Sequence, residues 1–219
     1  GGIAGYLYGD KAQIKNSANR GSVHTADVTG STIPLTSQAA NAGGVVGKVD
    51  SSSYLFNNDA KGASALKLLR GDEANAYGTY ATISNSYNTG SVSGFMGVGG
   101  IAGHMYKGSV ASSYNLGALR STRIANPASV DPVNMGGIVG DTGALTGGDG
   151  TVIYDVYNAG TIGDDEFTFL GRHVGGVVGR FSGTLDKAYN TGNIYNGYSV
   201  TGGVVGYWLS GDISNVFNT

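Results

Sequence analysis

The sequence predicts an all-β fold: a right-handed parallel β-helix, or β-solenoid, of about six coils with inserted loops. Two short motifs, one rich in glycine and one built around asparagine, alternate six times along the 219 residues, which is the pattern of stacked repeats. Glycine accounts for 40 residues, hydrophobic residues for 40% and charged residues for only 13%, against about 25% in typical globular chains. Such a chain can bury a thin, β-rich core that is stabilised by stacking of neighbouring repeats.

Each repeat opens with a glycine box: two glycines, two aliphatic or small residues and a third glycine. The copies occupy residues 1–5, 43–47, 99–103, 136–140, 175–179 and 202–206. The shortest interval, from Gly175 to Gly202, spans 27 residues and suits one coil of three short strands joined by glycine-marked bends. We therefore expect a single β-solenoid over residues 1–219, with repeats starting near 1, 43, 99, 136, 175 and 202. Because the chain begins without methionine and ends within a repeat, we expect it to be a fragment of a longer protein.

Side chains after each glycine box are expected to alternate between solvent and core. The first position after the box is mostly polar and is expected to face outward: Tyr6, Lys48, His104, Asp141, Arg180 and Tyr207. The second is mostly apolar and is expected to face inward: Leu7, Val49, Met105, Thr142, Phe181 and Trp208. The pattern thus predicts that the single tryptophan belongs to the core and is not a platform for a ligand.

The second motif, the asparagine box, begins with an aliphatic residue and carries Asn-X-Gly near its end, as in residues 83–92 (ISNSYNTGSV). Its asparagine occupies one position in all six repeats: Asn19, Asn88, Asn115, Asn158, Asn190 and Asn218. Equivalent positions of stacked strands lie about 4.8 Å apart, so these amides are expected to form a hydrogen-bonded ladder along the stacking axis.

Two further columns flank the ladder. The residue before the asparagine is aromatic in five repeats and alanine in the first, which predicts a structural stack of rings: Ala18, Tyr87, Tyr114, Tyr157, Tyr189 and Phe217. The glycine two positions after the asparagine is expected to adopt positive φ in a sharp bend: Gly21, Gly90, Gly117, Gly160 and Gly192.

Five insertions interrupt the repeats, at residues 24–42, 50–81, 120–134, 143–151 and 163–173. Insertions in repeat proteins project as loops and are the first candidates for specific binding.

The insertion at 50–81 carries its own signals. Residues 63–70 (ASALKLLR), followed by Gly71, predict a short helix with a glycine C-cap. The same stretch reads Arg70-Gly71-Asp72, the tripeptide that integrins bind on some adhesive proteins. A capping glycine between two solvated charges is the alternative interpretation.

One acidic cluster, Asp164, Asp165 and Glu166, offers oxygen ligands that suit Ca²⁺, as do Asp141 and Asp149 in their own loop. Neither set follows an EF-hand or the glycine-rich nonapeptide of calcium-binding β-rolls, so a solvated acidic loop is the competing interpretation. We expect no cofactor apart from this calcium candidate.

Zinc chemistry is not expected. The chain has no cysteine, and its three histidines, His24, His104 and His173, lie in different repeats without a His-Glu-X-X-His pattern.

Catalysis is not expected either. Some β-helices cleave polysaccharides with grouped carboxylates, but Asp155 aligns with Lys187 and Asp186 with Tyr154. The two carboxylates are thus offset by one position and are expected to face opposite ways. The sequence contains no nucleophile elbow and no P-loop.

Nucleic acid and membrane are not expected partners. The net charge is −2 without a Lys/Arg cluster, whereas phosphate binding requires a basic patch. No apolar run approaches the ~18 residues of a membrane helix.

The glycine box followed by the asparagine box, at its fullest in residues 83–92, resembles the GLUG repeat of bacterial surface proteins. Such repeats occur in filamentous haemagglutinin-like adhesins and in the non-catalytic repeat region of IgA-specific metallopeptidases. The resemblance covers almost the whole chain outside the insertions. It implies a β-helical fold and an extracellular position on the bacterial cell surface. It carries over no active site, because the zinc motif of those peptidases has no match here.

We therefore expect a non-catalytic surface scaffold, the stalk of an adhesin that attaches cells through a host or neighbouring-cell surface protein or glycan. Two alternatives stay open. One is an accessory module that positions the protein substrate of a secreted IgA-type metallopeptidase. The other is a self-assembling extracellular fibre subunit, since the open end of a solenoid exposes strand edges that can pair with another copy.

Overall fold

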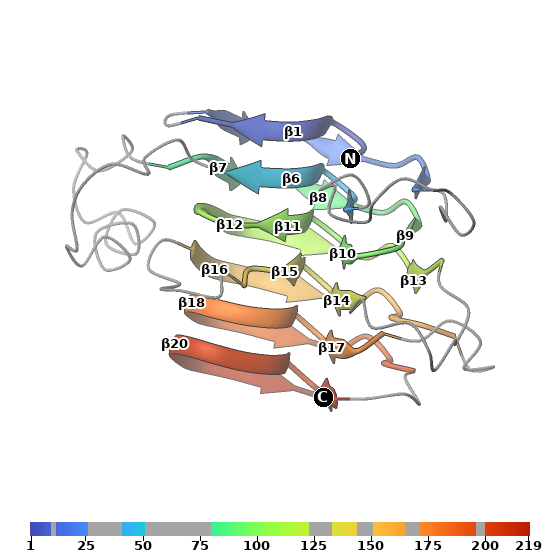
Figure 1. The fold of residues 1–219 in the computed structure, drawn as a ribbon, viewed down its shortest axis with the longest axis vertical. Coiled ribbons are helices and arrows are strands. Elements are labelled where there is room, and N and C mark those ends of the chain that lie inside the picture. Colours follow the sequence, from blue (N-terminus) through green and yellow to red (C-terminus); the bar gives the residue numbers. More distant parts are fainter. Residues whose placement is uncertain are drawn as a thin grey trace, which may run out of the picture.

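The computed structural model describes residues 1–9, 12–25, 41–50, 80–122, 133–143, 151–164, 171–195 and 200–219. All regular elements in these residues are β-strands, and the strand pairings among them are parallel. The fold is therefore all-β, as predicted, with parallel sheets (Figure 1). The predicted insertions fall mostly outside the described residues, and so does the helix predicted at 63–70.

Each repeat forms one layer, and strands of consecutive repeats lie side by side (Figure 1). We number the layers 1 to 6 by the glycine boxes that start at residues 1, 43, 99, 136, 175 and 202. The strand that follows the box is, in order, β1 (Ala4–Tyr8), β6 (Val46–Asp50), β11 (Ala102–Met105), β15 (Val139–Asp141), β18 (Val178–Asn190) and β20 (Val205–Asn218). The registers pair equivalent residues, for example Tyr6 with Lys48 and Asp141 with Arg180. Columns that align in the sequence are therefore columns in space.

The asparagine box supplies the next strand of each layer. In layers 1 to 4 these strands are β2 (Gln13–Lys15) with β3 (Ala18–Asn19), β7 (Thr82–Ser84) with β8 (Tyr87–Asn88), β12 (Gly108–Asn115) and β16 (Thr151–Asn158). In layers 5 and 6 the strand after the box continues into this position as the second half of β18 and β20. Together these elements form a 12-stranded sheet.

Two smaller sheets complete the layers. The five-stranded sheet contains β5 (Ala42–Gly43), β10 (Gly97–Gly99), β14 (Asn134–Gly136), β17 (His173–Gly175) and β19 (Val200–Gly202). The three-stranded sheet contains β4 (Val23–His24), β9 (Val92–Gly94) and β13 (Leu119–Ser121), and single bridges from Leu119 to Ile162 and from Ile162 to Ile194 extend it.

The predicted inward column is buried in layers 2 to 5. Val49, Met105 and Phe181 are 0% exposed and belong to the larger of two apolar clusters. Thr142 is equally buried; its hydroxyl accepts a hydrogen bond from the backbone nitrogen of Ser182 at 2.7 Å, which offsets the cost of burying a polar group. The prediction for Trp208 is wrong, because this side chain is 56% exposed. It shares the column of Phe181, but β20 is the outermost strand of the described stack and no described strand covers it.

The bend of the asparagine box also differs from the prediction. Six equivalent residues, three positions before the ladder asparagine, adopt positive φ between 45° and 53°: Asn16, Asn85, Ser112, Asp155, Lys187 and Asn215. The glycines of Asn-X-Gly are not among the positive-φ residues, so that prediction is wrong. Glycine is needed there for space instead, because a Cβ on Gly117 would overlap the carbonyl oxygen of Gly90 in the preceding layer.

Close packing also explains why the two boxes alternate one to one. A Cβ on Gly100, the second glycine of its box, would overlap the side chain of Asn115 and the carbonyl oxygen of Gly137 in the next layer. The second glycine of every box packs in the same way on the ladder asparagine of its own layer. Each asparagine box therefore requires a glycine box beside it.

Candidate functional site

The six ladder asparagines form a continuous series of side-chain hydrogen bonds through all six layers. Each Nδ2 donates to Oδ1 of the asparagine in the next layer at 2.7–2.8 Å. In five layers the same Nδ2 also donates to the carbonyl oxygen two residues further on. Asn88, Asn115 and Asn158 are 0% exposed, so the ladder pairs polar groups that would otherwise be unsatisfied in the interior. It is an internal support and not a binding surface.

The aromatic column forms a parallel stack beside the ladder, with ring centroids 4.9–5.1 Å apart from Tyr87 to Phe217. In layer 1 Ala18 provides no ring, and the side chain of Arg20 contacts Tyr87 instead. Its Nη2 donates to the Tyr87 hydroxyl at 2.8 Å, and its guanidinium lies 6.0 Å from the Tyr87 centroid. The faces of the inner rings are therefore occupied by neighbours and leave no face on which a sugar could stack.

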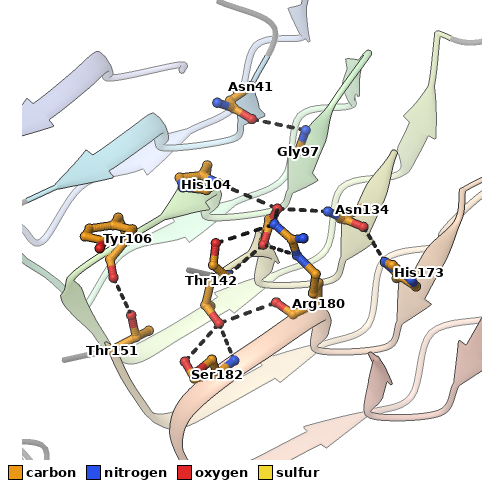
Figure 2. Close-up of polar contacts among 12 residues, drawn as sticks. Asn41, Gly97, His104, Tyr106, Asn134, Thr142, Thr151, His173, Arg180 and Ser182 are labelled. Carbon is orange, nitrogen blue, oxygen red and sulfur yellow. Dashed lines mark hydrogen bonds and ion pairs between the residues drawn. The ribbon is translucent and has the colours of Figure 1, made fainter. Parts of the chain in front are cut away.

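A third polar cluster, the polar seam, lies where the five-stranded sheet meets the 12-stranded sheet (Figure 2). It consists of His104, Asn134, Asp141, His173 and Arg180. The glycine box between Asn134 and Asp141 folds the chain back, so that Asn134 Nδ2 donates to Asp141 Oδ2 at 2.8 Å.

Asp141 is the centre of the seam. Arg180, one layer further on, donates from Nε to Oδ1 at 2.9 Å and from Nη2 to Oδ2 at 2.8 Å. The backbone nitrogen of Gly143 donates to Oδ1 at 2.7 Å. Asp141 is only 6% exposed, which corrects the prediction that it faces outward into solvent. Asn134 of the neighbouring sheet and Arg180 of the next layer cover its carboxylate.

The charges around Asp141 decide its ionisation. Burial by itself raises the pKa of this carboxyl, but the proximity of His104 and the hydrogen bonds and charge of Arg180 outweigh burial and lower the pKa to about 2. His104 Nδ1 lies 3.8 Å from Oδ2, beyond hydrogen-bond distance. The paired hydrogen bonds of Arg180 are therefore the stronger support for the charged form.

The protonation of His173 follows from the same network. A carboxylate has no proton to donate, so Asn134 must direct Nδ2 to Asp141 and Oδ1 to His173. His173 Nδ1, 2.8 Å from that oxygen, then carries the proton. Burial lowers the pKa of His173, and the charges of Arg172 and Arg180 lower it further, against an opposing effect of Asp141. The ring also stacks on Tyr207 of layer 6, with centroids 4.6 Å apart.

The geometry of the seam limits its chemistry. Both oxygens of Asp141 are engaged by the donors of Asn134, Gly143 and Arg180. A general base or a metal ligand needs a free lone pair directed at its target, and Asp141 directs none. The seam therefore joins layers 3 to 5, and the stacking of His173 on Tyr207 links it to layer 6. The sequence does not reveal the seam as a unit, because Asn134 and His173 are two residues before the glycine box whereas the other members follow it.

Most residues of the predicted Arg-Gly-Asp and calcium sites lie outside the described part of the chain. Arg70, Gly71 and Asp72 lie outside the described residues, as do Asp165 and Glu166. Asp164 is described and half-buried, so the acidic cluster as a calcium site stays a prediction. Among the described residues, no group of three or more His, Asp or Glu side chains is placed to hold a metal ion.

The two carboxylates weighed for polysaccharide cleavage occupy different surroundings. Asp155 is exposed and accepts a hydrogen bond from Ser112 Oγ at 2.9 Å. Asp186, which pairs in register with Tyr154, is 0% exposed and accepts bonds from Ser214 Oγ at 2.8 Å and Asn215 Nδ2 at 2.6 Å. One is exposed to solvent and the other is buried, so the two carboxylates lie in different environments.

Comparison with known proteins adds no relative: no family model matches the chain, and neither a curated protein nor a solved structure is significantly similar to it. In the described part of the chain, no helix has the length and apolar character needed to cross a membrane. The likeness to GLUG repeats therefore stays a prediction from the sequence.

Proposed function

We propose that the chain is a right-handed parallel β-helix that acts as a non-catalytic scaffold, the stalk of an exported bacterial adhesin at the cell surface. The observation that carries the proposal is the asparagine ladder, in which one residue per layer bonds to its equivalent through all six layers. Three parallel sheets that each take strands from successive layers support a β-helix over one closed parallel barrel. In a barrel, strands from all repeats would follow one another around a single sheet.

The use of the polar side chains supports a scaffold. The ladder, the ring stack and the polar seam all connect one layer to the next. Groups committed in this way stabilise a rod and are not free to bind a partner. We therefore assign attachment to the insertions, and first to the longest, at 50–81.

The registers define a clean way to remove that insertion. They pair Val49 with Met105 and Thr82 with Ser109, so Tyr106, Lys107 and Gly108 of layer 3 make the connection that residues 50–81 make in layer 2. Replacing residues 51–81 by Lys-Gly gives layer 2 the connection of layer 3.

A matched control removes a different insertion. The registers pair Asp141 with Arg180 and Val152 with Thr184, so deleting residues 144–150 gives layer 4 the length of layer 5. Binding of the labelled wild type and both variants to cultured cells is measured by flow cytometry, and folding by circular dichroism.

We expect the 51–81 replacement to lower cell binding at least about tenfold, equivalent to 1.4 kcal/mol, with folding retained, and the 144–150 deletion to bind like the wild type. Equal binding by all three proteins would remove the 50–81 insertion as the attachment site. A wild type that binds no cell surface would refute the adhesin proposal itself.

A further inference from the structure

We propose that the stacked tyrosines of layers 2 to 5 are a site of oxidative modification, at which a peroxidase-type oxidant and hydrogen peroxide couple rings of neighbouring layers into dityrosine. This tyrosine row consists of Tyr87, Tyr114, Tyr157 and Tyr189. The inference goes beyond attachment and does not depend on it. Three observations support it: hydroxyl groups that the fold does not use, the alignment of the rings, and the access of solvent to their edges.

The fold uses the rings of the tyrosine row but not most of their hydroxyl groups. Phe217, which has no hydroxyl, stacks on Tyr189 with centroids 4.9 Å apart and ring planes 3° apart, as closely as two tyrosines of the row stack on each other. Within the described part of the chain, three of the four hydroxyls have no hydrogen-bond partner, those of Tyr114, Tyr157 and Tyr189. Packing therefore requires aromatic rings in this column but does not require phenols.

The rings of the row are aligned so that equivalent atoms of neighbours lie beside each other. The registers pair the tyrosines in succession, Tyr87 with Tyr114, Tyr114 with Tyr157 and Tyr157 with Tyr189. Their centroids are 4.9–5.1 Å apart and their planes lie within 8° of parallel. Since the centroid separation is close to the strand spacing of about 4.8 Å, each ring is nearly a translated copy of the one before. The ortho carbon of one phenol therefore faces the ortho carbon of the next.

The edges of the rings are open to an oxidant, although their faces are covered by neighbours. All four side chains of the row are half-buried, so an oxidant reaches them from solvent and the rings have room to tilt toward each other. Burial and the nearby phenols of Tyr114 and Tyr189 raise the pKa of Tyr157 above its ordinary value of 10.0. Its oxygen is therefore protonated at neutral pH and releases a proton when the ring loses an electron.

The coupling balances with two phenols and one peroxide. The oxidant removes one electron from each of two neighbouring phenols, and each hydroxyl releases its proton, which gives two phenoxyl radicals. The radicals form a carbon–carbon bond between their ortho carbons, and the hydrogen on each of these carbons moves to the phenol oxygen and restores the hydroxyl. Hydrogen peroxide takes up the two electrons and two protons, its O–O bond breaks, and two molecules of water leave.

A dityrosine between layers acts as a covalent link along the stack. The chain contains no cysteine, so no disulfide can join one layer to another. Tyr114 and Tyr157 belong to strands β12 and β16 of layers 3 and 4, and the chain between them forms a long loop. A cross-link that closes such a loop restricts the unfolded chain, as a disulfide does.

The pair of Tyr114 and Tyr157 can be followed by mass spectrometry. Trypsin releases residues 108–120, in which Tyr114 is the only tyrosine, and residues 124–172, which contain Tyr154 and Tyr157. The folded protein in dilute solution is treated with a haem peroxidase and hydrogen peroxide, and the monomer is isolated under denaturing conditions and digested. We expect the two peptides to be joined, with a mass lower than their sum by two hydrogens.

Two variants compare a stacked phenol with an unstacked phenol of the same peptide. Tyr157→Phe keeps the ring and removes only the hydroxyl, and Phe217 shows that phenylalanine fits the stack. Tyr154→Phe is the matched control, because Tyr154 lies on the same strand but is 8% exposed and outside the row. We expect Tyr157→Phe to abolish the joined peptides and Tyr154→Phe to leave their yield unchanged, with both variants folded by circular dichroism.

The opposite results are equally clear. An absence of joined peptides from the oxidised wild type, or equal yields from the two variants, would overturn the proposal. Because the readout is the mass of peptides, these outcomes are independent of whether the chain attaches to cells.

Discussion

Replacing Asn115 by alanine in the middle of the ladder should strongly destabilise the fold. Asn115 Nδ2 donates to Gly117 O at 2.9 Å and to Asn158 Oδ1 at 2.8 Å. Its Oδ1 accepts from Asn88 Nδ2 at 2.8 Å and from the backbone nitrogen of Gly117 at 3.1 Å. Four hydrogen bonds therefore depend on one fully buried side chain.

The four bonds do not cost the same when they are lost. Asn88 Nδ2 keeps its bond to Gly90 O, and Asn158 Oδ1 keeps the bond from the Gly160 nitrogen. The buried nitrogen and oxygen of Gly117 are left without a partner. Each unsatisfied buried group costs about 1–3 kcal/mol, so these two groups alone should lower the free energy of unfolding by about 4 kcal/mol. That is a large part of the ~5–15 kcal/mol that stabilises a typical domain.

Urea unfolding followed by far-ultraviolet circular dichroism measures the difference. Asn218→Ala is the matched control, because it removes a single bond, from Asn190, at the exposed end of the ladder and should cost about 0.5–1.5 kcal/mol. If Asn115→Ala were no more destabilising than Asn218→Ala, the argument from buried, orphaned backbone groups would be refuted.

Three further predictions follow from the structure. The pKa of Asp141 in the folded protein, about 2, lies below its ordinary 3.8. Its contribution to folding stability is therefore present above about pH 4 and is lost as the pH falls toward 2. Over that interval the wild type should lose about 2 kcal/mol more stability than Asp141→Asn in acid unfolding. Gly140→Ala would bring its Cβ within 2.5–2.8 Å of the Val98 backbone, whereas Gly5→Ala in the same column meets nothing within 4 Å. In thermal melts, Gly140→Ala should lower the free energy of unfolding by about 3 kcal/mol and Gly5→Ala by under about 0.5 kcal/mol. Ser112 has φ of 45°, a conformation that asparagine tolerates better. Ser112→Asn should therefore raise the free energy of unfolding, measured in urea, by about 0.5 kcal/mol. A lower free energy of unfolding would contradict the strain argument.

The parts of the fold that the sequence predicts are those in which one residue type repeats. The ladder asparagines and the aromatic column share an identity in nearly every layer, and the registers place both columns as aligned. Their chemistry requires identity, since an amide pairs best with an amide and a flat ring stacks best on a flat ring. Repetition is then visible in a single sequence.

The parts that the sequence did not predict are those in which geometry repeats but residue type does not. Four of the six residues in the positive-φ column are asparagine or aspartate, which tolerate this conformation, but Ser112 and Lys187 adopt it too, because the constraint acts on the backbone. Asn-X-Gly suggested a bend at its glycine, and the close approach of neighbouring layers is what requires glycine there. Trp208 was misplaced for a different reason: alternation along a strand predicts which face a side chain takes but not whether another layer covers that face.

The contrast between repeated and unrepeated contacts bears on how the layers find their order. The ladder presents the same donor and acceptor in every layer, so it stabilises any layer on any other. The seam differs, because the ion pair of Asp141 and Arg180 forms only when layer 4 meets layer 5. Removing one partner of such a pair leaves an uncompensated, mostly buried charge, so an exchange of layers there is costly. The order of the interior layers is therefore specified by contacts that occur once, such as the ion pair of Asp141 and Arg180.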